Sequence, residues 1–261
     1  MKEYFISEID IEKLYHLSDI KIKLDSNKRQ HLLLTGKNGS GKTSLLLEIE
    51  KFLRAINDEK LSQVFDQYPT WINEAKKKVL SASSDSEKYA ADKDLKQCLG
   101  FLKKYSDGVQ INLNQYEGLE MMYHNGKFIT AYFPSERKAQ FMRPNGVENI
   151  TLENTYGIDE SAGDILLKYM VHLKTQQAYA RNEGDQTTAD KIQQWFDRFD
   201  LALQILLDEE SIHIEYDYKK YDFKIRQNGR EPFSFNELSD GYSSVIYIVS
   251  DLILSCLLYT S

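Results

Sequence analysis

The order of apolar and polar residues predicts strands and helices in alternation along the first quarter of this chain of 261 residues. Alternation over residues 3–11 and 20–24 predicts two strands. Residues 31–35 form a short apolar run, which predicts a strand buried on both faces. Residues 42–56 repeat apolar positions at helical spacing. A glycine-rich bend therefore joins a predicted buried strand to a predicted amphipathic helix.

The rest of the chain divides into helical and strand-like blocks. Residues 59–104 keep a polar helical pattern, interrupted at Tyr68-Pro69 and by a serine-rich loop over 81–86, and we interpret them as a helical insertion. Helices are also predicted over 162–181, 187–207 and 241–258. Strands are predicted over 109–115, 119–123, 127–133, 212–218 and 221–227, with turns at 124–126 and at Asn228-Gly229 before 232–235.

The bend at residues 36–43 reads Gly-Lys-Asn-Gly-Ser-Gly-Lys-Thr and fits the phosphate-binding pattern G-x-x-x-x-G-K-[ST]. Its glycines allow backbone N–H groups to surround phosphates, and the following helix presents the positive end of its dipole. Lys42 is expected to reach the β- and γ-phosphates, and the Thr43 hydroxyl to bind Mg²⁺. The alternative is a glycine-rich turn without a ligand. The expected nucleotide contacts are Gly36, Lys37, Asn38, Gly39, Ser40, Gly41, Lys42, Thr43 and Ser44.

A second motif, Leu-Ser-Asp-Gly-Tyr at residues 238–242, precedes the last predicted helix. Ser239 is placed to cap that helix, and its hydroxyl together with the N–H groups near Gly241 can bind a phosphate. A helix cap without a ligand is the alternative. The motif resembles the Leu-Ser-Gly-Gly-Gln signature of ABC-type ATPases, with Asp240 in place of the first glycine and Tyr242 in place of glutamine.

The amino-terminal strands, the two motifs, the helical insertion and Tyr-Phe-Pro-Ser-Glu-Arg at 132–137 together resemble the AAA family of ABC-like ATPases. These are relatives of SMC and recombination-repair ATPases found in prokaryotic antiphage systems such as retrons and Septu-type pairs. The resemblance implies an α/β fold, a three-layer P-loop NTPase of ABC-ATPase type with an N-terminal antiparallel β element. It also implies one ATPase domain over 1–261, with a helical lobe from 52–104 and 160–207.

The resemblance extends to ligands and partners. It implies ATP and Mg²⁺ as cofactors and a homodimer closed through ATP, in which Ser239 of one chain binds the γ-phosphate held by the P-loop of the other. A DNA, RNA or effector nuclease partner stays open. The competing interpretations are the nucleotide-binding subunit of an ABC transporter, which lacks so large an insertion, and a P-loop phosphotransferase, which has no use for the motif at 238–242.

ABC-like ATPases also carry, after the signature helix, an apolar strand that ends in Asp-Glu. Residues 204–209 end in Asp208-Glu209 but precede the signature and continue a helical pattern, so we assign them to the helix. We therefore expect this chain to lack the Walker B acids, the D-loop and the switch His, and to hydrolyse ATP only in its complete form. Residues 255–261 resemble a translated sequencing-adapter tail.

Other residues are weaker candidates. Arg137, beside Glu136 and Gln140, lies where ABC ATPases sense the γ-phosphate, with a surface ion pair as the alternative. Tyr15 or His16 could stack on adenine, with exposure or core packing as the alternative.

Composition narrows the functional class. The chain contains 41% apolar residues and a net charge of -7, which favours a globular protein without an extensive nucleic-acid-binding surface. Acidic residues at the amino terminus and the absence of a long apolar run predict a cytoplasmic protein that does not enter a membrane. Cys98 and Cys256 are interpreted as small hydrophobic residues.

Overall fold

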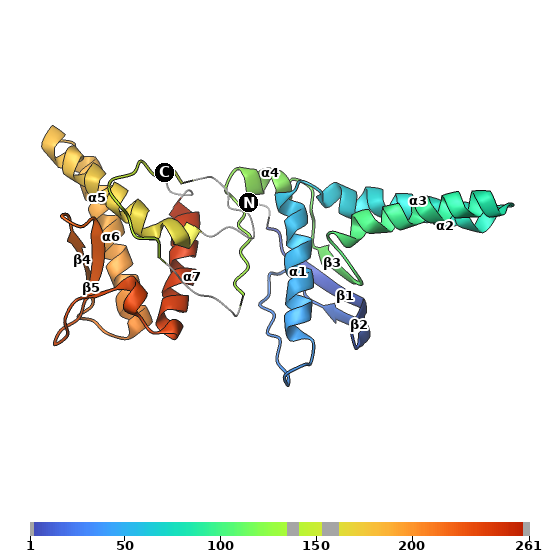
Figure 1. The fold of residues 1–261 in the computed structure, drawn as a ribbon, viewed down its shortest axis with the longest axis horizontal. Coiled ribbons are helices and arrows are strands. Elements are labelled where there is room, and N and C mark those ends of the chain that lie inside the picture. Colours follow the sequence, from blue (N-terminus) through green and yellow to red (C-terminus); the bar gives the residue numbers. More distant parts are fainter. Residues whose placement is uncertain (1–2, 135–140, 153–161, 258–261) are drawn as a thin grey trace. The chain divides into compact units, whose positions relative to one another are not determined.

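The computed structural model describes residues 3–134, 141–152 and 162–257. The chain divides into two compact units, residues 1–132 and 133–261, each with its own hydrophobic core (Figure 1). The elements of the first unit are β1 (Ile6–Leu14), β2 (Leu17–Lys23), α1 (Lys42–Asn57), η1 (Gln63–Gln67), α2 (Tyr68–Ser81), α3 (Asp85–Lys103), β3 (Val109–Leu113) and α4 (Leu119–His124). Those of the second are η2 (Ala162–Ile165), α5 (Leu166–Glu183), α6 (Gln186–Leu207), β4 (His213–Asp217), β5 (Asp222–Arg226), β6 (Phe233–Ser234), η3 (Phe235–Glu237) and α7 (Asp240–Leu257).

The first unit contains a three-stranded antiparallel sheet in the order β2-β1-β3. Ile9 of the central strand lies opposite Ile22 on one side and Ile111 on the other. Because side chains alternate between the two faces of a strand, Ile9 and Ile11 point the same way, and both are fully buried. The strands predicted from residues 3–11, 20–24 and 109–115 are confirmed, with shifted ends.

Helix α1 packs its apolar side against β3 and α4. Phe52, Ala55 and Ile56 fall on one face of the helix and are almost completely buried in the core of the first unit. The predicted helix over residues 42–56 is therefore confirmed.

Helices α2 and α3 lie side by side as a long hairpin (Figure 1). Helix α2 begins at Tyr68, directly after a π-helical turn, and Pro69 is tolerated in its first turn because the first N–H groups of a helix have no internal partner. A capping box begins α3: the Glu87 N–H donates to Ser84 Oγ at 3.3 Å, and the Ser84 N–H donates to the Glu87 carboxylate at 3.2 Å. The helical pattern predicted over residues 59–104 is confirmed as this hairpin.

Two predicted strands of the first unit are wrong. Residues 119–123 belong to helix α4, with Leu119 and Tyr123 buried four positions apart on its inner face. The predicted hairpin turn ends that helix instead: Gly126 has φ 64°, and the N–H of Lys127 donates to the Met122 carbonyl at 2.8 Å, which is a common way to terminate a helix. No strand forms over residues 127–133, all of which are described.

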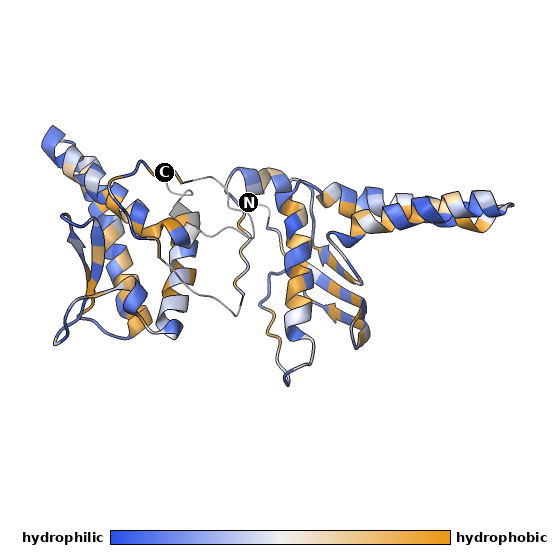
Figure 2. Ribbon diagram, in the orientation of Figure 1, coloured by the Kyte–Doolittle hydropathy of each residue, from blue (hydrophilic) through white to orange (hydrophobic). Residues whose placement is uncertain are grey.

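The predicted buried strand at residues 31–35 is also wrong. The segment forms no ladder with any strand of the described residues, and its Leu33 side chain is 83% exposed. Figure 2 shows this apolar segment beside α1. A run of apolar residues indicates a segment suited to burial, but a strand is buried on both faces only when other strands lie beside it. The described sheet of this unit pairs β1, β2 and β3 only.

The second unit packs a helical hairpin and α7 against an antiparallel meander in the order β4-β5-β6. Gly184, with φ 81°, ends α5, and the Asp185 carboxylate then accepts the Thr188 N–H at 3.0 Å to begin α6. The core is rich in aromatic rings, with Phe223 and Phe235 fully buried. The predicted helices and strands after residue 162 are confirmed.

Both described sheets are small and antiparallel. The two segments predicted to form one helical lobe belong to different units, residues 52–104 to the first and 160–207 to the second. No helix of the described chain has the length and apolar character needed to cross a bilayer.

Candidate nucleotide-binding site

The candidate phosphate-binding loop turns sharply between the extended segment and α1. Gly36, Gly39 and Gly41 have φ values of 150°, 79° and 90°, in the region that side-chain-bearing residues rarely adopt. A Cβ at Gly36 would lie 2.8 Å from Ser40 Oγ, and one at Gly41 would lie 2.8 Å from Leu17 Cδ1. Glycine is therefore favoured throughout the loop by backbone conformation, and at Gly41 a Cβ would also press on the Leu17 side chain, which packs against the core of this unit.

The Lys42 ammonium folds back over the loop. Lys42 Nζ donates to the carbonyl oxygens of Gly36 and Lys37 at 2.8 and 2.9 Å and contacts Ser40 Oγ at 3.4 Å. A positive charge is thereby fixed above a turn of the backbone. Carbonyl oxygens are weaker partners for an ammonium group than phosphate oxygens are, because charge-assisted hydrogen bonds to an anion are stronger. The charge of Lys42 is consequently available to an incoming phosphate.

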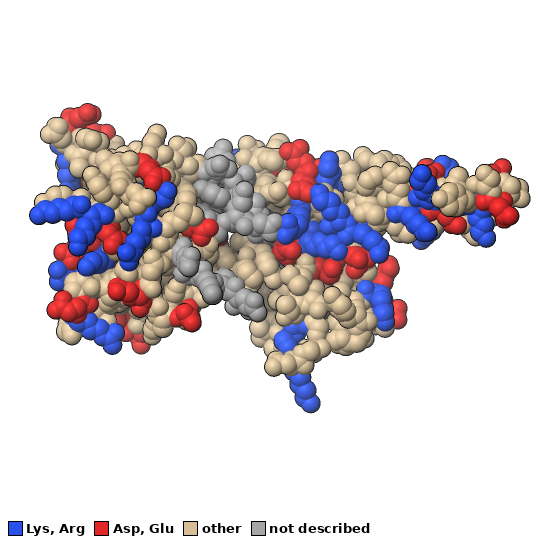
Figure 3. All heavy atoms as spheres, viewed as in Figure 1, with Lys and Arg blue, Asp and Glu red and all other residues tan. Residues whose placement is uncertain are grey.

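The first turn of α1 supplies backbone donors next to this charge. The first helical hydrogen bond runs from the Leu45 N–H to the Gly41 carbonyl at 2.9 Å, so the N–H groups of residues 42–44 have no helical acceptor. No side chain caps the helix, and no acidic residue occupies its first turn. In Figure 3 basic side chains project at this end of α1. The loop thus combines free amides, a helix dipole and a lysine, all of which attract an anion.

Thr43 fits the role expected of a magnesium ligand. Its side chain is exposed at the start of α1, and within the described chain its hydroxyl makes no hydrogen bond. Mg²⁺ bound to a nucleotide takes most of its ligands from water and phosphate and needs only one or two from the protein. The described residues contain no cluster of three or more His, Cys, Asp or Glu that could hold a metal, so the threonine hydroxyl and the nucleotide would have to supply this site.

The turn between β1 and β2 lies against the loop. The position that a Cβ would take at Gly41 is 3.6 Å from His16 Cε1, as well as being close to Leu17. Tyr15 in the same turn is 77% exposed and has φ 54°. The structure therefore brings His16 near the candidate phosphate-binding loop, with Tyr15 next to it in the same turn. The sequence analysis did not predict that Leu17 packs against Gly41. An apolar residue between the polar residues His16 and Ser18 was a signal for this contact.

The second motif forms the start of α7. The Ser239 carbonyl accepts the Ser243 N–H at 2.8 Å, which places Ser239 at the cap position that the sequence predicts. Ser239, Asp240, Gly241 and Tyr242 are all exposed. The hydroxyl and the first amides of α7 therefore face solvent, where a ligand can reach them.

Two contacts fix the chain that enters α7. The Ser234 N–H donates to the Glu237 carboxylate at 2.5 Å, and this hydrogen bond lowers the pKa of Glu237. The Asn236 side chain bonds to the backbone of Phe141 in both directions, each at 3.1 Å. Ser239 follows directly after the turn that these hydrogen bonds hold, and the turn therefore fixes Ser239 at the start of α7.

The remaining candidates are the acidic pair Asp208-Glu209 and Arg137. Helix α6 continues to Leu207, and Asp208, with φ 50°, ends it. The interpretation as helix is confirmed for residues 204–207, whereas Asp208 and Glu209 lie just beyond the helix end. Both Glu209 oxygens are already bound, one to Ser211 and the other to Gln227. Arg137, expected to sense the γ-phosphate, lies outside the described residues.

The candidate phosphate-binding loop belongs to the first unit and the second motif to the other. Each is complete as a local structure: a glycine turn closed by Lys42, and a helix start marked by Ser239. Comparisons with protein-family models, with curated protein sequences and with solved structures found no match to this chain.

Proposed function

We propose that this chain is the ATP-binding part of an ABC-like ATPase. The observation that carries the proposal is the Lys42 ammonium held 2.8 Å from the Gly36 carbonyl, over a loop that leads into the uncapped end of α1. Three features converge on this turn: a lysine, a row of backbone amides and the positive end of a helix dipole. Together they favour a phosphate chain over an uncharged ligand.

Each residue then has a defined task. The amides of residues 39–44 surround the α- and β-phosphates, and Lys42 leaves the loop carbonyls to contact the β- and γ-phosphates. Thr43 holds Mg²⁺, which neutralises phosphate charge when bound. Tyr15 or His16 contacts the base. Preorganised donors of this kind stabilise the charge that develops on a transferred phosphoryl group.

The second motif completes the site in a dimer. In this proposal, ATP lies between two chains, and Ser239 with the amides near Gly241 binds the γ-phosphate held by the other chain. The complete enzyme hydrolyses the nucleotide, and closure of the dimer controls a nucleic-acid-processing or antiphage effector. Ser239 is exposed, so a phosphate held by another chain can reach its hydroxyl.

The test is ATP binding by calorimetry with Lys42→Ala. Removing the ammonium is expected to weaken the binding of Mg²⁺–ATP by tenfold or more, because a charge-assisted contact to phosphate is lost. Lys51→Ala is the matched control. Lys51 lies on the same helix but pairs with Glu48 at 3.3 Å, away from the loop. Equal affinities for the two variants, or no heat from the parent chain, would refute the proposal.

A further inference from the structure

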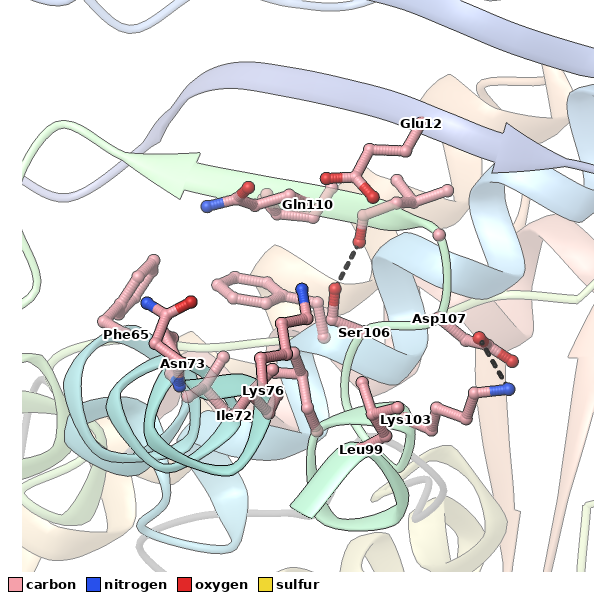
Figure 4. A pocket seen from close by; sticks show the side chains of 17 residues that line it. Glu12, Phe65, Ile72, Asn73, Lys76, Leu99, Lys103, Ser106, Asp107 and Gln110 are labelled. Carbon is pink, nitrogen blue, oxygen red and sulfur yellow. Dashed lines mark hydrogen bonds and ion pairs between the residues drawn. The ribbon is translucent and has the colours of Figure 1, made fainter. Parts of the chain in front are cut away.

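A second concave site lies in the first unit, between the sheet and the base of the α2–α3 hairpin (Figure 4). Its volume is ≈ 340 Å³, within the range of about 300 to 1,000 Å³ that small-molecule sites occupy. No residue of the P-loop or of the second motif lines it. The phosphate-binding role does not account for it.

The floor and one side of this pocket are apolar. Phe52 of α1 and Val109 and Ile111 of β3 are each 1% exposed and form the floor, while Phe65 and Ile72 belong to the helical side. A ligand that covered these side chains would bury apolar surface, which is the main source of affinity for a small molecule.

Several polar groups at the rim already have partners. The Ser106 hydroxyl donates to the Val109 carbonyl at 2.6 Å, and Lys103 pairs with Asp107 at 3.4 Å. Each of these groups would have to break an existing interaction in order to bind a ligand. We therefore do not expect them to determine which kind of ligand the pocket binds.

Two charges of opposite sign remain. Figure 4 shows the Glu12 carboxylate reaching in from β1 and the Lys76 ammonium from α2, on opposite sides of the pocket. Within the described part of the chain, neither forms an ion pair. A carboxylate and an ammonium that face one cavity without pairing are complementary to a ligand that carries both charges.

We propose that this pocket binds a small zwitterion with an apolar side chain, that is, a free α-amino acid of the aromatic or branched aliphatic class. Its ammonium group lies toward Glu12, its carboxylate toward Lys76, and its side chain over Phe52 and Ile72. An uncharged apolar molecule would leave both charges unmatched, and a simple anion would leave Glu12 facing it. The pocket floor is formed partly by the helix that begins at the P-loop, so the occupant is placed to influence that helix.

The test measures the binding of L-phenylalanine to the full chain by calorimetry, without nucleotide. Two analogues separate the charges: 3-phenylpropanoate lacks the ammonium group, and 2-phenylethylamine lacks the carboxylate. L-Phenylalanine is expected to bind with a Kd of about 1 mM, given its few heavy atoms. Each analogue is expected to bind roughly two- to fivefold more weakly, the range for a solvent-exposed ion pair.

Variants assign the charges to residues. Glu12→Gln should remove the preference for L-phenylalanine over 3-phenylpropanoate, and Lys76→Met the preference over 2-phenylethylamine. Both side chains are exposed, so the fold is retained. Lys77→Met, next to Lys76 but outside the pocket, should change neither preference. No saturable binding, equal binding of all three probes, or equal effects of Lys76→Met and Lys77→Met would each overturn the proposal. Lys42→Ala should leave this binding intact, which separates it from nucleotide binding.

Discussion

Gly41 gives the most direct test of the loop geometry. It occupies the left-handed region with φ 90°, immediately before α1. A Cβ there would lie 2.8 Å from Leu17 Cδ1. Gly39 has a similar φ of 79°, but nothing lies within 4 Å of the position its Cβ would take. Alanine at these two positions therefore separates backbone strain from steric contact.

The expected magnitudes follow from these two terms. Placing a residue with a side chain in the left-handed region costs about 1 to 2 kcal/mol, and Gly39→Ala should cost no more than this. Gly41→Ala adds an overpacked contact with Leu17, which typically costs about 1 to 3 kcal/mol. The total for Gly41→Ala is then about 2 to 5 kcal/mol of unfolding free energy.

The two tryptophans allow the first unit to be followed alone. Trp71 lies on α2 in the first unit, and Trp195 lies on α6 in the second. In a Trp195→Phe background, urea denaturation followed by fluorescence reports on Trp71, whose ring lies 5.7 Å from Tyr68 and 6.5 Å from Phe101. The difference in unfolding free energy between the two alanine variants is the measured quantity.

Leu17→Ala provides the check on mechanism. Truncating Leu17 removes the atom that the new methyl group would meet, so the double variant with Gly41→Ala should recover most of the contact cost. If Gly41→Ala proved no more destabilising than Gly39→Ala, or if Leu17→Ala gave no recovery, the close packing of the β1–β2 turn on the loop would be wrong.

Two further predictions concern polar contacts in the two units. Hydrogen bonds from the Thr188 side chain and N–H lower the pKa of Asp185 below its ordinary 3.8. The charged Asp185 therefore stabilises α6 fully at pH values above 3.8, and this stabilisation is lost as the pH falls through the lower pKa of the folded state. Acid unfolding followed by Trp195 fluorescence should show this dependence, which Asp185→Asn, retaining the cap oxygen but not the titration, should lack. Tyr105→Phe should lower the unfolding free energy of the first unit by about 1 kcal/mol in urea denaturation, because the Tyr105 hydroxyl donates to Asp58 at 2.8 Å in a nearly buried position. An unchanged midpoint would show that water replaces this hydroxyl without loss.

The sequence predicted the long helices well because their signals are local. Apolar periodicity, the Ser84–Glu87 capping box and Gly184 each act within a few residues of the backbone they determine. The glycine-rich turn at residues 36–41 was equally accessible, since Gly36, Gly39 and Gly41 take the positive φ values that favour glycine; the binding of phosphate by this turn stays a prediction. The serine at the start of α7 was found in the same way.

Errors arose where the outcome depends on distant segments. Residues 119–123 contain apolar residues that suit either a strand or a helix, and the α4 helix is selected by burial of Leu119 and Tyr123 in the core beside α1. The pocket at the base of the hairpin brings Glu12 and Lys76 together from distant positions in the sequence. No local pattern identifies such a juxtaposition.

The extended segment at residues 31–35 affects how the protein behaves in concentrated solution. Its backbone donors and acceptors have no partners in the described chain, and Leu33 stands exposed on it. The edge strand β2, by contrast, carries Lys21 and Lys23, and charges of this kind discourage intermolecular strand pairing. Two chains brought close together would therefore pair through residues 31–35 before they paired along the edge formed by β2. In concentrated solution, association between chains should therefore begin at the segment that precedes Gly36.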